Sequence, residues 1–218
     1  MPKSKVEQYT QVDMVRKSNA LIIGNGKSRL IFDLNQYKEH YVTYGCNALY
    51  RDFMPDYLIS HDMGIADEIV EKRVHYHTRF YTQRGTKMNY RASIGEPINF
   101  VIQDKWLGDS GTGAIRLACI NNHDNIYMIG FDYCDSNNKI HNVYQGTKHY
   151  SPKPLDYAQN FVLHQWENRL QYLLDNYKHI NFIHVRDTDS YKPRIKNTNY
   201  NTMSRNEFKE TINELQNG

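Results

Sequence analysis

Short apolar runs recur along this chain, and each of them ends in glycine or in a small polar residue. Runs of four or five apolar residues bounded by turn residues are typical of strands that are buried on both faces of a sheet. Between the runs, apolar residues recur at helical spacing. The expected strands are residues 20–23, 41–44, 57–60, 126–129 and 181–185, and the expected helices are residues 27–37, 63–73, 109–122 and 156–177.

This alternation of strands and helices predicts an α/β fold. We expect a doubly wound, Rossmann-like and mainly parallel sheet with helices on both faces. Residues 74–82 and 98–102 are weaker strand candidates. Residues 133–153 are polar and without periodicity, and a loop of that length is usually functional or mobile. Ser204 followed by Glu207 is a capping box that predicts a last helix over residues 204–216.

The chain of 218 residues is expected to form one main domain with two appendages. Residues 1–17 are polar and aperiodic and are expected to be an arm. Residues 18–190 are expected to be the nucleotide-binding and catalytic domain. Residues 191–218 are expected to be a tail that carries the last helix.

Composition excludes several classes of protein. No run of about 18 apolar residues occurs, which argues against a transmembrane helix, and residues 1–17 hold no apolar core of a secretory signal. Cys46, Cys119 and Cys134 are widely spaced, so we expect reduced cysteines and a cytoplasmic protein. The net charge of +3 is too small to indicate a nucleic acid partner. A homo-oligomer is compatible with these data.

In a doubly wound sheet, ligands bind at the carboxyl ends of the strands. The polar residues that follow the expected strands should therefore meet at one edge, joined by the start of the helix at residue 110. We expect a nucleotide site there, built from Gly24, Asn25, Gly26, Lys27, Ser28, Asn47, Asp62, Ser110, Gly111, Thr112, Gly113, Asp132 and Tyr133.

Two glycine-containing segments are the candidate phosphate cradles. Residues 24–28 follow a strand and precede a helix, and residues 110–113 open a helix; both could present free backbone N–H groups to a phosphate. Residues 24–28 lack the spacing of a Walker A loop, and Arg29 stands where a dinucleotide fingerprint needs its third glycine. The alternatives are an ordinary βα turn and an N-cap with small residues for close packing.

Three further side chains have a functional and a structural interpretation each. Asn47 could bind a base or ribose, or form an Asx turn. Asp132 could accept hydrogen bonds from sugar hydroxyls, or cap a turn. Asp62 could orient a substrate or ligate Mg²⁺, and it also suits the N-cap of the helix that follows.

Histidines of the long polar loop are the candidate general bases, because a neutral imidazole can accept a proton near pH 7. His149 is the first candidate and His141 is an alternative; His164, which lies on the expected helix over residues 156–177, remains a further alternative. Tyr144 is the candidate that assists a departing phosphate. Each histidine could equally be an ordinary surface or core residue.

The ordered motifs resemble a known family. Residues 22–28 (IIGNGKS), 44–47 (YGCN), 110–113 (SGTG) and 126–132 (IYMIGFD) resemble the bacterial family 42 sialyltransferases and their relatives, which include the 6-hydroxymethylpterin pyrophosphokinase-like proteins. The resemblance covers roughly residues 20–185.

The resemblance implies specific roles for the matched residues. Asn25 and Asn47 would contact the nucleotide donor, and Ser110 to Thr112 would contact its phosphate or ribose. Tyr133 or Tyr144 would assist the leaving phosphate, and His149 would be the base. Lys27 stands where the family loop has a proline; in the reaction expected for this chain, Tyr144 or Lys27 would balance the charge of the departing phosphate.

These observations lead to one main hypothesis and two alternatives. The chain would transfer a sugar from a nucleotide sugar, such as a CMP-sugar, to an acceptor hydroxyl, without any required cofactor. The first alternative is a pyrophosphokinase-like phosphotransferase that needs Mg²⁺, held by Asp62 or Asp132. The second is a catalytically idle nucleotide-binding protein.

Overall fold

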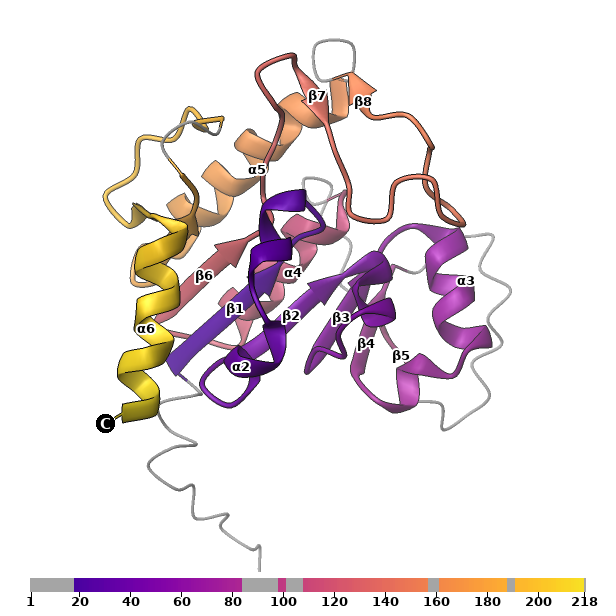
Figure 1. Cartoon of the computed structure of the whole chain (residues 1–218), viewed down its shortest axis with the longest axis horizontal. Helices are drawn as coiled ribbons and strands as arrows, with labels where there is room; N and C mark the ends of the chain where they lie inside the picture. The colour runs from indigo at the N-terminus through magenta and orange to yellow at the C-terminus, as the bar shows by residue number, and fades with distance from the viewer. Residues whose placement is uncertain (1–17, 84–97, 101–107, 157–160, 188–190, 218) are drawn as a thin grey trace, which may run out of the picture.

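A computed structural model of the chain describes residues 18–83, 98–100, 108–156, 161–187 and 191–217. Its centre is an eight-stranded sheet in the order β10-β9-β6-β1-β2-β3-β4-β5, in which every described pairing is parallel (Figure 1). The strands are β1 (Asn19–Ile23), β2 (Val42–Cys46), β3 (Tyr57–Ser60), β4 (Arg79–Thr82), β5 (Ile98–Phe100), β6 (Asn125–Ile129), β9 (Asn181–Val185) and β10 (Tyr200–Met203).

The winding direction of the sheet reverses at its centre. From β1 the chain proceeds through β2 to β5 on one side, and it then returns to place β6, β9 and β10 on the other side. The α/β, Rossmann-like fold class is thereby confirmed. The helical segments are η1 (Lys27–Ile31), α2 (Leu34–Lys38), η2 (Asn47–Arg51), α3 (Met63–Glu71), η3 (Val74–Tyr76), α4 (Ser110–Ile120), α5 (Phe161–Asn176) and α6 (Arg205–Asn217).

Helices cover both faces of the sheet because the strands are apolar on both. In β1, Ala20 and Ile22 pack with α4 and α5 on one face, whereas Leu21 and Ile23 pack with α2 and α6 on the other. All four side chains have no exposed surface. Burying a leucine or isoleucine side chain contributes roughly 1.5–3 kcal/mol, so Leu21, Ile22 and Ile23 strongly stabilise the packing of helices on both faces of the sheet.

Two expected elements differ from the observed ones. The helix expected over residues 27–37 is divided into η1 and α2, because Asp33 caps a new helix by accepting a hydrogen bond from Asn35 N at 3.2 Å. The strand expected over residues 74–82 starts only at Arg79. Arg73 has a left-handed φ of 57° and is followed by the 3-10 turn η3.

The C-terminal segment is part of the central core. Residues 191–218 were expected to be a tail that carries the last helix, but β10 adds an edge strand to the sheet beside β9. Phe208 of α6 is fully buried and stacks on Tyr37 with ring centroids 5.0 Å apart. The capping box is present, with Ser204 and Glu207 exchanging backbone-to-side-chain hydrogen bonds of 2.7 and 3.2 Å. The expected arm, residues 1–17, lies outside the described residues.

A small hairpin, which sequence periodicity did not reveal, begins in the long polar loop and ends just after it. The two-residue strands β7 (Lys139–Ile140) and β8 (Leu155–Asp156) pair antiparallel. Figure 1 shows this hairpin above the carboxyl edge of the sheet, beside α5. It therefore stands over the edge at which a ligand is expected to bind.

Cys46, Cys119 and Cys134 are unpaired and buried. Burial raises the pKa of the Cys46 thiol to about 12, so this cysteine carries no reactive thiolate. Among the residues that the structure describes, none of the helices has the length and apolar character needed to cross a bilayer.

Candidate functional site

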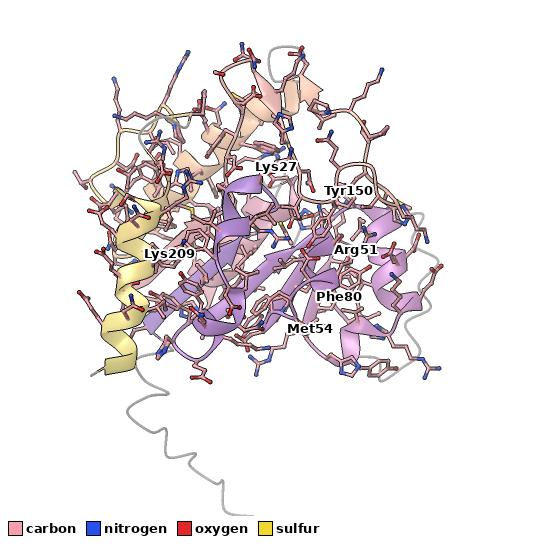
Figure 2. All side chains as sticks on the ribbon, in the orientation of Figure 1. Lys27, Arg51, Met54, Phe80, Tyr150 and Lys209 are labelled. Atoms are coloured by element: carbon pink, nitrogen blue, oxygen red, sulfur yellow. The ribbon has the colours of Figure 1, made fainter. Side chains whose placement is uncertain are left out.

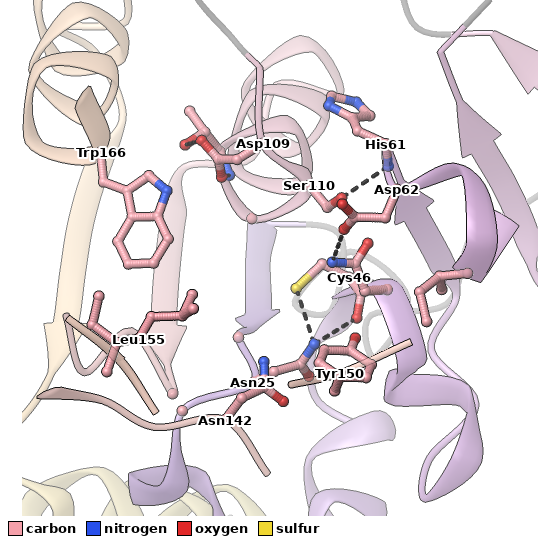
Figure 3. Close-up of a pocket in the computed structure, with 18 of the residues that line it drawn as sticks. Asn25, Cys46, His61, Asp62, Asp109, Ser110, Asn142, Tyr150, Leu155 and Trp166 are labelled. Carbon is pink, nitrogen blue, oxygen red and sulfur yellow. Dashed lines mark hydrogen bonds between the residues drawn. The ribbon is translucent and has the colours of Figure 1, made fainter. Parts of the chain in front are cut away.

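A cavity of about 820 Å³ opens at the carboxyl edge of the sheet, under the hairpin of β7 and β8 (Figure 3). It lies at the reversal point between β1 and β6, where doubly wound sheets bind ligands. The site residues expected from the sequence that line it are Gly24, Asn25, Gly26, Asn47, Asp62, Ser110, Gly111, Thr112, Asp132, Tyr133 and His149. Lys27, Ser28, Gly113 and Tyr144 are not among the lining residues.

The glycines after β1 and β6 let two loops touch. Gly24 N donates to Ile129 O at 2.8 Å, and Gly26 N donates to Gly130 O at 2.9 Å. A Cβ atom on residue 24 would overlap the carbonyl oxygen of Gly130. Close contact between the two loops therefore accounts for these glycines without a ligand. This agrees with the alternative in which residues 24–28 are an ordinary βα turn.

Asp132 occupies the place at which a phosphate was expected. Its carboxylate accepts hydrogen bonds from Ser28 N at 3.0 Å and from Ser28 Oγ. The helix that follows the loop is the five-residue 3-10 segment η1, and Lys27 is exposed. The expectation that Lys27 and Ser28 cradle a phosphate is therefore not supported, because a carboxylate of the chain itself already binds there.

The start of α4 is capped in a similar way. The Asp109 carboxylate accepts hydrogen bonds from Thr112 N and Thr112 Oγ1, both at 2.7 Å, and forms an ion pair with Arg169 at 2.7 Å. Thr112 is thus engaged by its own N-cap. Sequence analysis did not assign a role to Asp109, although aspartate three positions before threonine at a helix start is a capping signal.

Ser110 and Gly113 hold His61 against the helix. Ser110 Oγ accepts a hydrogen bond from His61 N at 2.8 Å. A Cβ atom on residue 113 would lie 3.1 Å from His61 Cε1, so the glycine provides close packing and not a ligand contact. Burial lowers the pKa of the His61 imidazole, which is consistent with a neutral side chain near pH 7.

Asn25 lines the cavity and carries an unsatisfied acceptor atom. The residue is 8% exposed, and its Nδ2 donates to Cys46 O at 3.0 Å. This bond fixes the amide, and Oδ1 is buried without a hydrogen-bond partner. Buried polar groups in native proteins are nearly always paired, and an exception in a cavity indicates a missing ligand or water.

Asn47 and Asp62 form a connected pair. Asn47 Nδ2 donates to Asp62 Oδ2 at 2.6 Å, and Asn47 Oδ1 accepts from Ser60 Oγ at 3.0 Å. Asn47 has a φ of 53°, a conformation that asparagine tolerates better than most residues. Both the nitrogen and the oxygen of its amide bind side chains of the protein, so Asn47 orients the Asp62 carboxylate at the cavity wall.

His149 stands between the cavity and helix α3. Its imidazole packs against Gly64, where a Cβ atom would lie 2.6 Å from His149 Nδ1. His149 Nε2 is 3.4 Å from the carboxylate of Glu68, a side chain that is 2% exposed. His149 also has a left-handed φ of 71°. Such backbone strain is found most often at functional sites.

Arg51 fixes the loop that carries His149. It forms an ion pair with Glu68 at 2.9 Å and donates to Thr147 Oγ1 at 2.8 Å and to Lys148 O at 3.2 Å. Its guanidinium also lies 5.9 Å from the ring centre of Tyr150, and Figure 2 shows the two side chains near one another. His149 is thus attached to α3 through a network that sequence analysis did not find.

Tyr144 is buried away from the cavity. It is 4% exposed, its hydroxyl donates to Asp52 Oδ2 at 2.8 Å, and it accepts from Arg29 at 2.7 Å. Burial raises the pKa of this hydroxyl above its ordinary value. The expected assistance of a leaving phosphate is therefore not supported for Tyr144, whereas the nearby Tyr150 lines the cavity.

Three candidate site residues remain to be placed, and two of them line the cavity. Tyr133 lines the cavity and packs against Trp166 and Tyr191, with ring centroids 6.2 and 5.5 Å apart. His141 also lines it, with Nε2 3.1 Å from Asp135 Oδ2. The side chain of His164 lies outside the described part of the structure.

Unsatisfied polar atoms are concentrated in this cavity. Buried side-chain polar atoms that find no hydrogen-bond partner occur on five of its lining residues: Asn25, His61, His141, Gln145 and Trp166. Sequence analysis missed Gln145 and Trp166, because a lone glutamine or tryptophan carries no motif. Within the described ranges, no three His, Cys, Asp or Glu side chains converge as metal ligands do.

The chain is similar to solved structures of a sialyltransferase. No family model matches the chain, and no curated protein matches it. Two solved structures are similar over 76% of this chain. One is the sialyltransferase CstII from Campylobacter jejuni in complex with the substrate analogue CMP-3FNeuAc, with 14% identity, a TM-score of 0.44 and 81% of that chain covered. The other is a point mutant of alpha-2,3/8-sialyltransferase CstII, with 13% identity, a TM-score of 0.42 and 80% of that chain covered. Neither supports the pyrophosphokinase-like part of the expected resemblance.

Proposed function

We propose that this chain is a glycosyltransferase that takes a sugar from a nucleotide donor, such as a CMP-sugar, and transfers it to an acceptor hydroxyl. The observation that carries the proposal is the buried and unpartnered Asn25 Oδ1 in a cavity at the reversal point of the sheet. A cavity of about 820 Å³ falls within the range of natural small-molecule sites.

The wall around Asn25 suits a nucleotide. Because Asn25 Nδ2 is held by Cys46 O, Oδ1 is left as the unpaired acceptor of this residue and would select a hydroxyl or amino group. Ser110 supplies a hydroxyl at the head of α4, and this hydroxyl can donate a hydrogen bond while its oxygen accepts one from His61 N. An acceptor and a donor in one wall suit the ribose hydroxyl groups of a nucleotide.

His149 is the proposed general base. It would accept the proton of the acceptor hydroxyl while that oxygen forms a bond to the anomeric carbon of the donor sugar. The bond between this carbon and the phosphate oxygen breaks, and the electron pair leaves with the nucleotide. Lys153 and Tyr150 line the same cavity and would stabilise the charge of the departing phosphate.

A ligand screen by thermal unfolding tests the nucleotide part. The free protein is heated with CMP, UDP, GDP or ATP, each with and without Mg²⁺. Stabilisation by CMP or another of these nucleotides without metal is expected, because a ligand that binds the folded state raises the unfolding temperature. Release of free nucleotide from the matching nucleotide sugar then tests the transfer.

Two outcomes would replace the proposal by an alternative. Stabilisation by ATP only with Mg²⁺ would indicate a phosphotransferase, for which the Asp62 carboxylate held by Asn47 is the available metal ligand in the cavity. Stabilisation without any nucleotide release in the presence of acceptors would indicate a nucleotide-binding protein without catalysis. No response to any nucleotide would contradict both transferase proposals.

A further inference from the structure

A buried carboxylate stands behind the proposed general base. Glu68 of α3 is 2% exposed, and its Oε2 atom lies 3.4 Å from His149 Nε2. His149 lines the cavity, whereas Glu68 is not among the lining residues. The pair therefore joins a side chain of the cavity to a charge in the protein interior.

The Glu68 carboxylate is ionised and fixed in position. Its Oε1 atom accepts hydrogen bonds from the Tyr50 hydroxyl, from Lys72 Nζ at 2.9 Å and from Arg51 Nε at 3.1 Å. Arg51 Nη2 also binds Oε2, at 2.9 Å. Burial by itself raises the pKa of Glu68, but these hydrogen bonds outweigh it and hold the pKa at about 2. At neutral pH, a negative charge that cannot rotate away therefore faces His149.

This charge decides which nitrogen of His149 carries the hydrogen. A neutral imidazole has one N–H group and one nitrogen with a lone pair. A lone pair on Nε2 would be repelled by the carboxylate 3.4 Å away, whereas an N–H group at Nε2 is attracted to it. The hydrogen therefore belongs on Nε2, and Nδ1 is the nitrogen that can accept a proton.

Gly64 leaves room beside that same Nδ1 atom. A Cβ atom on residue 64 would lie 2.6 Å from His149 Nδ1, which is closer than a van der Waals contact allows. Gly64 lines the cavity, so Nδ1 lies next to a residue of the cavity wall. Gly64 and Glu68 are four residues apart on α3 and share one face of the helix. Two residues of one helix thus approach the two nitrogens of the His149 ring.

We propose that Glu68 is a positioning residue for His149, and that Nδ1 is the atom of His149 that accepts the proton of the acceptor hydroxyl. This inference rests on the proposed function, in which His149 is the base. The hydroxyl oxygen bonds to the anomeric carbon while its proton moves to Nδ1, and the bond from that carbon to phosphate breaks with its electron pair leaving on the nucleotide. The imidazole becomes a cation, which the Glu68 carboxylate stabilises without taking the proton.

The tautomer of His149 can be measured without any substrate. Long-range ¹H–¹⁵N NMR spectra of the histidine-labelled protein distinguish a nitrogen that carries hydrogen from one that does not, and the His149 signals are those missing in His149→Gln. In mildly alkaline solution we expect hydrogen on Nε2 and a bare Nδ1. In Glu68→Ala, the share of the Nδ1–H tautomer should rise several-fold. A bare Nε2 in the parent chain, or unchanged tautomers in Glu68→Ala, would overturn the proposal.

The kinetics of Glu68→Gln test the positioning role, because the amide keeps the size of the side chain and removes its charge. We expect kcat to fall about 10- to 100-fold while KM for the nucleotide sugar changes less than about twofold, since proton transfer is impaired and ground-state binding is not. In a chain that carries His149→Ala, the same substitution should have no further effect on kcat. Additive losses would show that Glu68 does not act through His149.

Glu71→Gln and Lys72→Ala are the matched controls. Glu71 is exposed on the same helix, so the loss of its charge should leave kcat unchanged. Lys72→Ala removes a cation 2.9 Å from the Glu68 carboxylate but keeps the carboxylate, so it should lower stability and leave kcat within about twofold. Thermal unfolding confirms that each variant is folded in the assay. A loss of kcat in Lys72→Ala as large as that in Glu68→Gln would assign the effect to stability and overturn the proposal.

The results separate this inference from the proposed function. The expected tautomer in a protein that transfers no sugar would contradict the transferase and leave the assignment of the hydrogen to Nε2 in place. Sugar transfer with an unchanged kcat in Glu68→Gln would overturn the positioning role and leave the transferase in place.

Discussion

Asp132 and Gly26 approach each other so closely that a Cβ atom on residue 26 would lie 2.5 Å from Asp132 Cγ. The same carboxylate binds Ser28, so one acidic side chain joins the loop after β6 to the loop after β1. The absence of a side chain at residue 26 leaves the space that the Asp132 carboxylate occupies when it binds Ser28.

Replacing Gly26 by alanine should destabilise the protein through Asp132. The new methyl group would push the carboxylate away from Ser28, at a cost of about 1–3 kcal/mol in the free energy of unfolding. In a chain that already carries Asp132→Ala, the same substitution should cost much less, because the atom it collides with is gone. Urea unfolding of the two single variants and the double variant measures this, and additive costs would contradict the linkage.

Replacing Asn25 by alanine should weaken nucleotide binding. The substitution deletes the unpaired acceptor of a residue that lines the cavity, and we expect at least about tenfold weaker binding, equivalent to about 1.4 kcal/mol. Calorimetric titration with the nucleotide found in the thermal screen measures it. Asn121→Ala is the matched control, because Asn121 donates to Tyr44 and does not line the cavity. Unchanged affinity in the Asn25 variant would place the nucleotide elsewhere.

Replacing Gly64 by alanine should move the His149 side chain without destabilising the fold. Alanine is about 1 kcal/mol better than glycine inside a helix, so α3 should not weaken. The methyl group would displace the His149 imidazole, and the transfer rate should fall at least about tenfold with unchanged nucleotide affinity. Adding His149→Ala should cause little further loss. Full activity of the Gly64 variant would remove His149 from the reaction.

The stability that Glu68 provides should depend on pH. Burial by itself raises the pKa of Glu68, but hydrogen bonds from Tyr50, Lys72 and Arg51 outweigh it and hold this pKa at about 2. Because the folded-state value lies below the ordinary 4.5, the contribution is complete above about pH 4.5 and is lost as the pH falls toward 2.

Comparison of the parent chain with Glu68→Gln tests this dependence. The variant should be less stable by about 1–3 kcal/mol at pH 7, and the difference should shrink at pH 3. Urea unfolding at both values measures it. An equal difference at the two pH values would show that the Glu68 charge is not responsible.

Apolar periodicity was sufficient to predict the parallel α/β sheet. The strands over residues 57–60 and 181–185 were located at their observed bounds, because a buried strand needs apolar side chains on both faces. The edge strand β10, with the sequence YNTM, was missed because half-exposed residues need no apolar pattern. The hairpin of β7 and β8 was missed for the same reason.

The sequence by itself determined where the cavity would be, since the carboxyl ends of parallel strands must share an edge. Only the tertiary structure decided what each side chain does there. Asp109 and Asp132 bind backbone N–H groups that were expected to bind phosphate, and Tyr144 is turned into the core by Arg29 and Asp52. The physical reason is that a hydrogen bond requires two partners at about 3 Å, and the partners here are far apart in the sequence. Motifs specify which groups are available, whereas packing specifies which of them remain unpaired for a ligand.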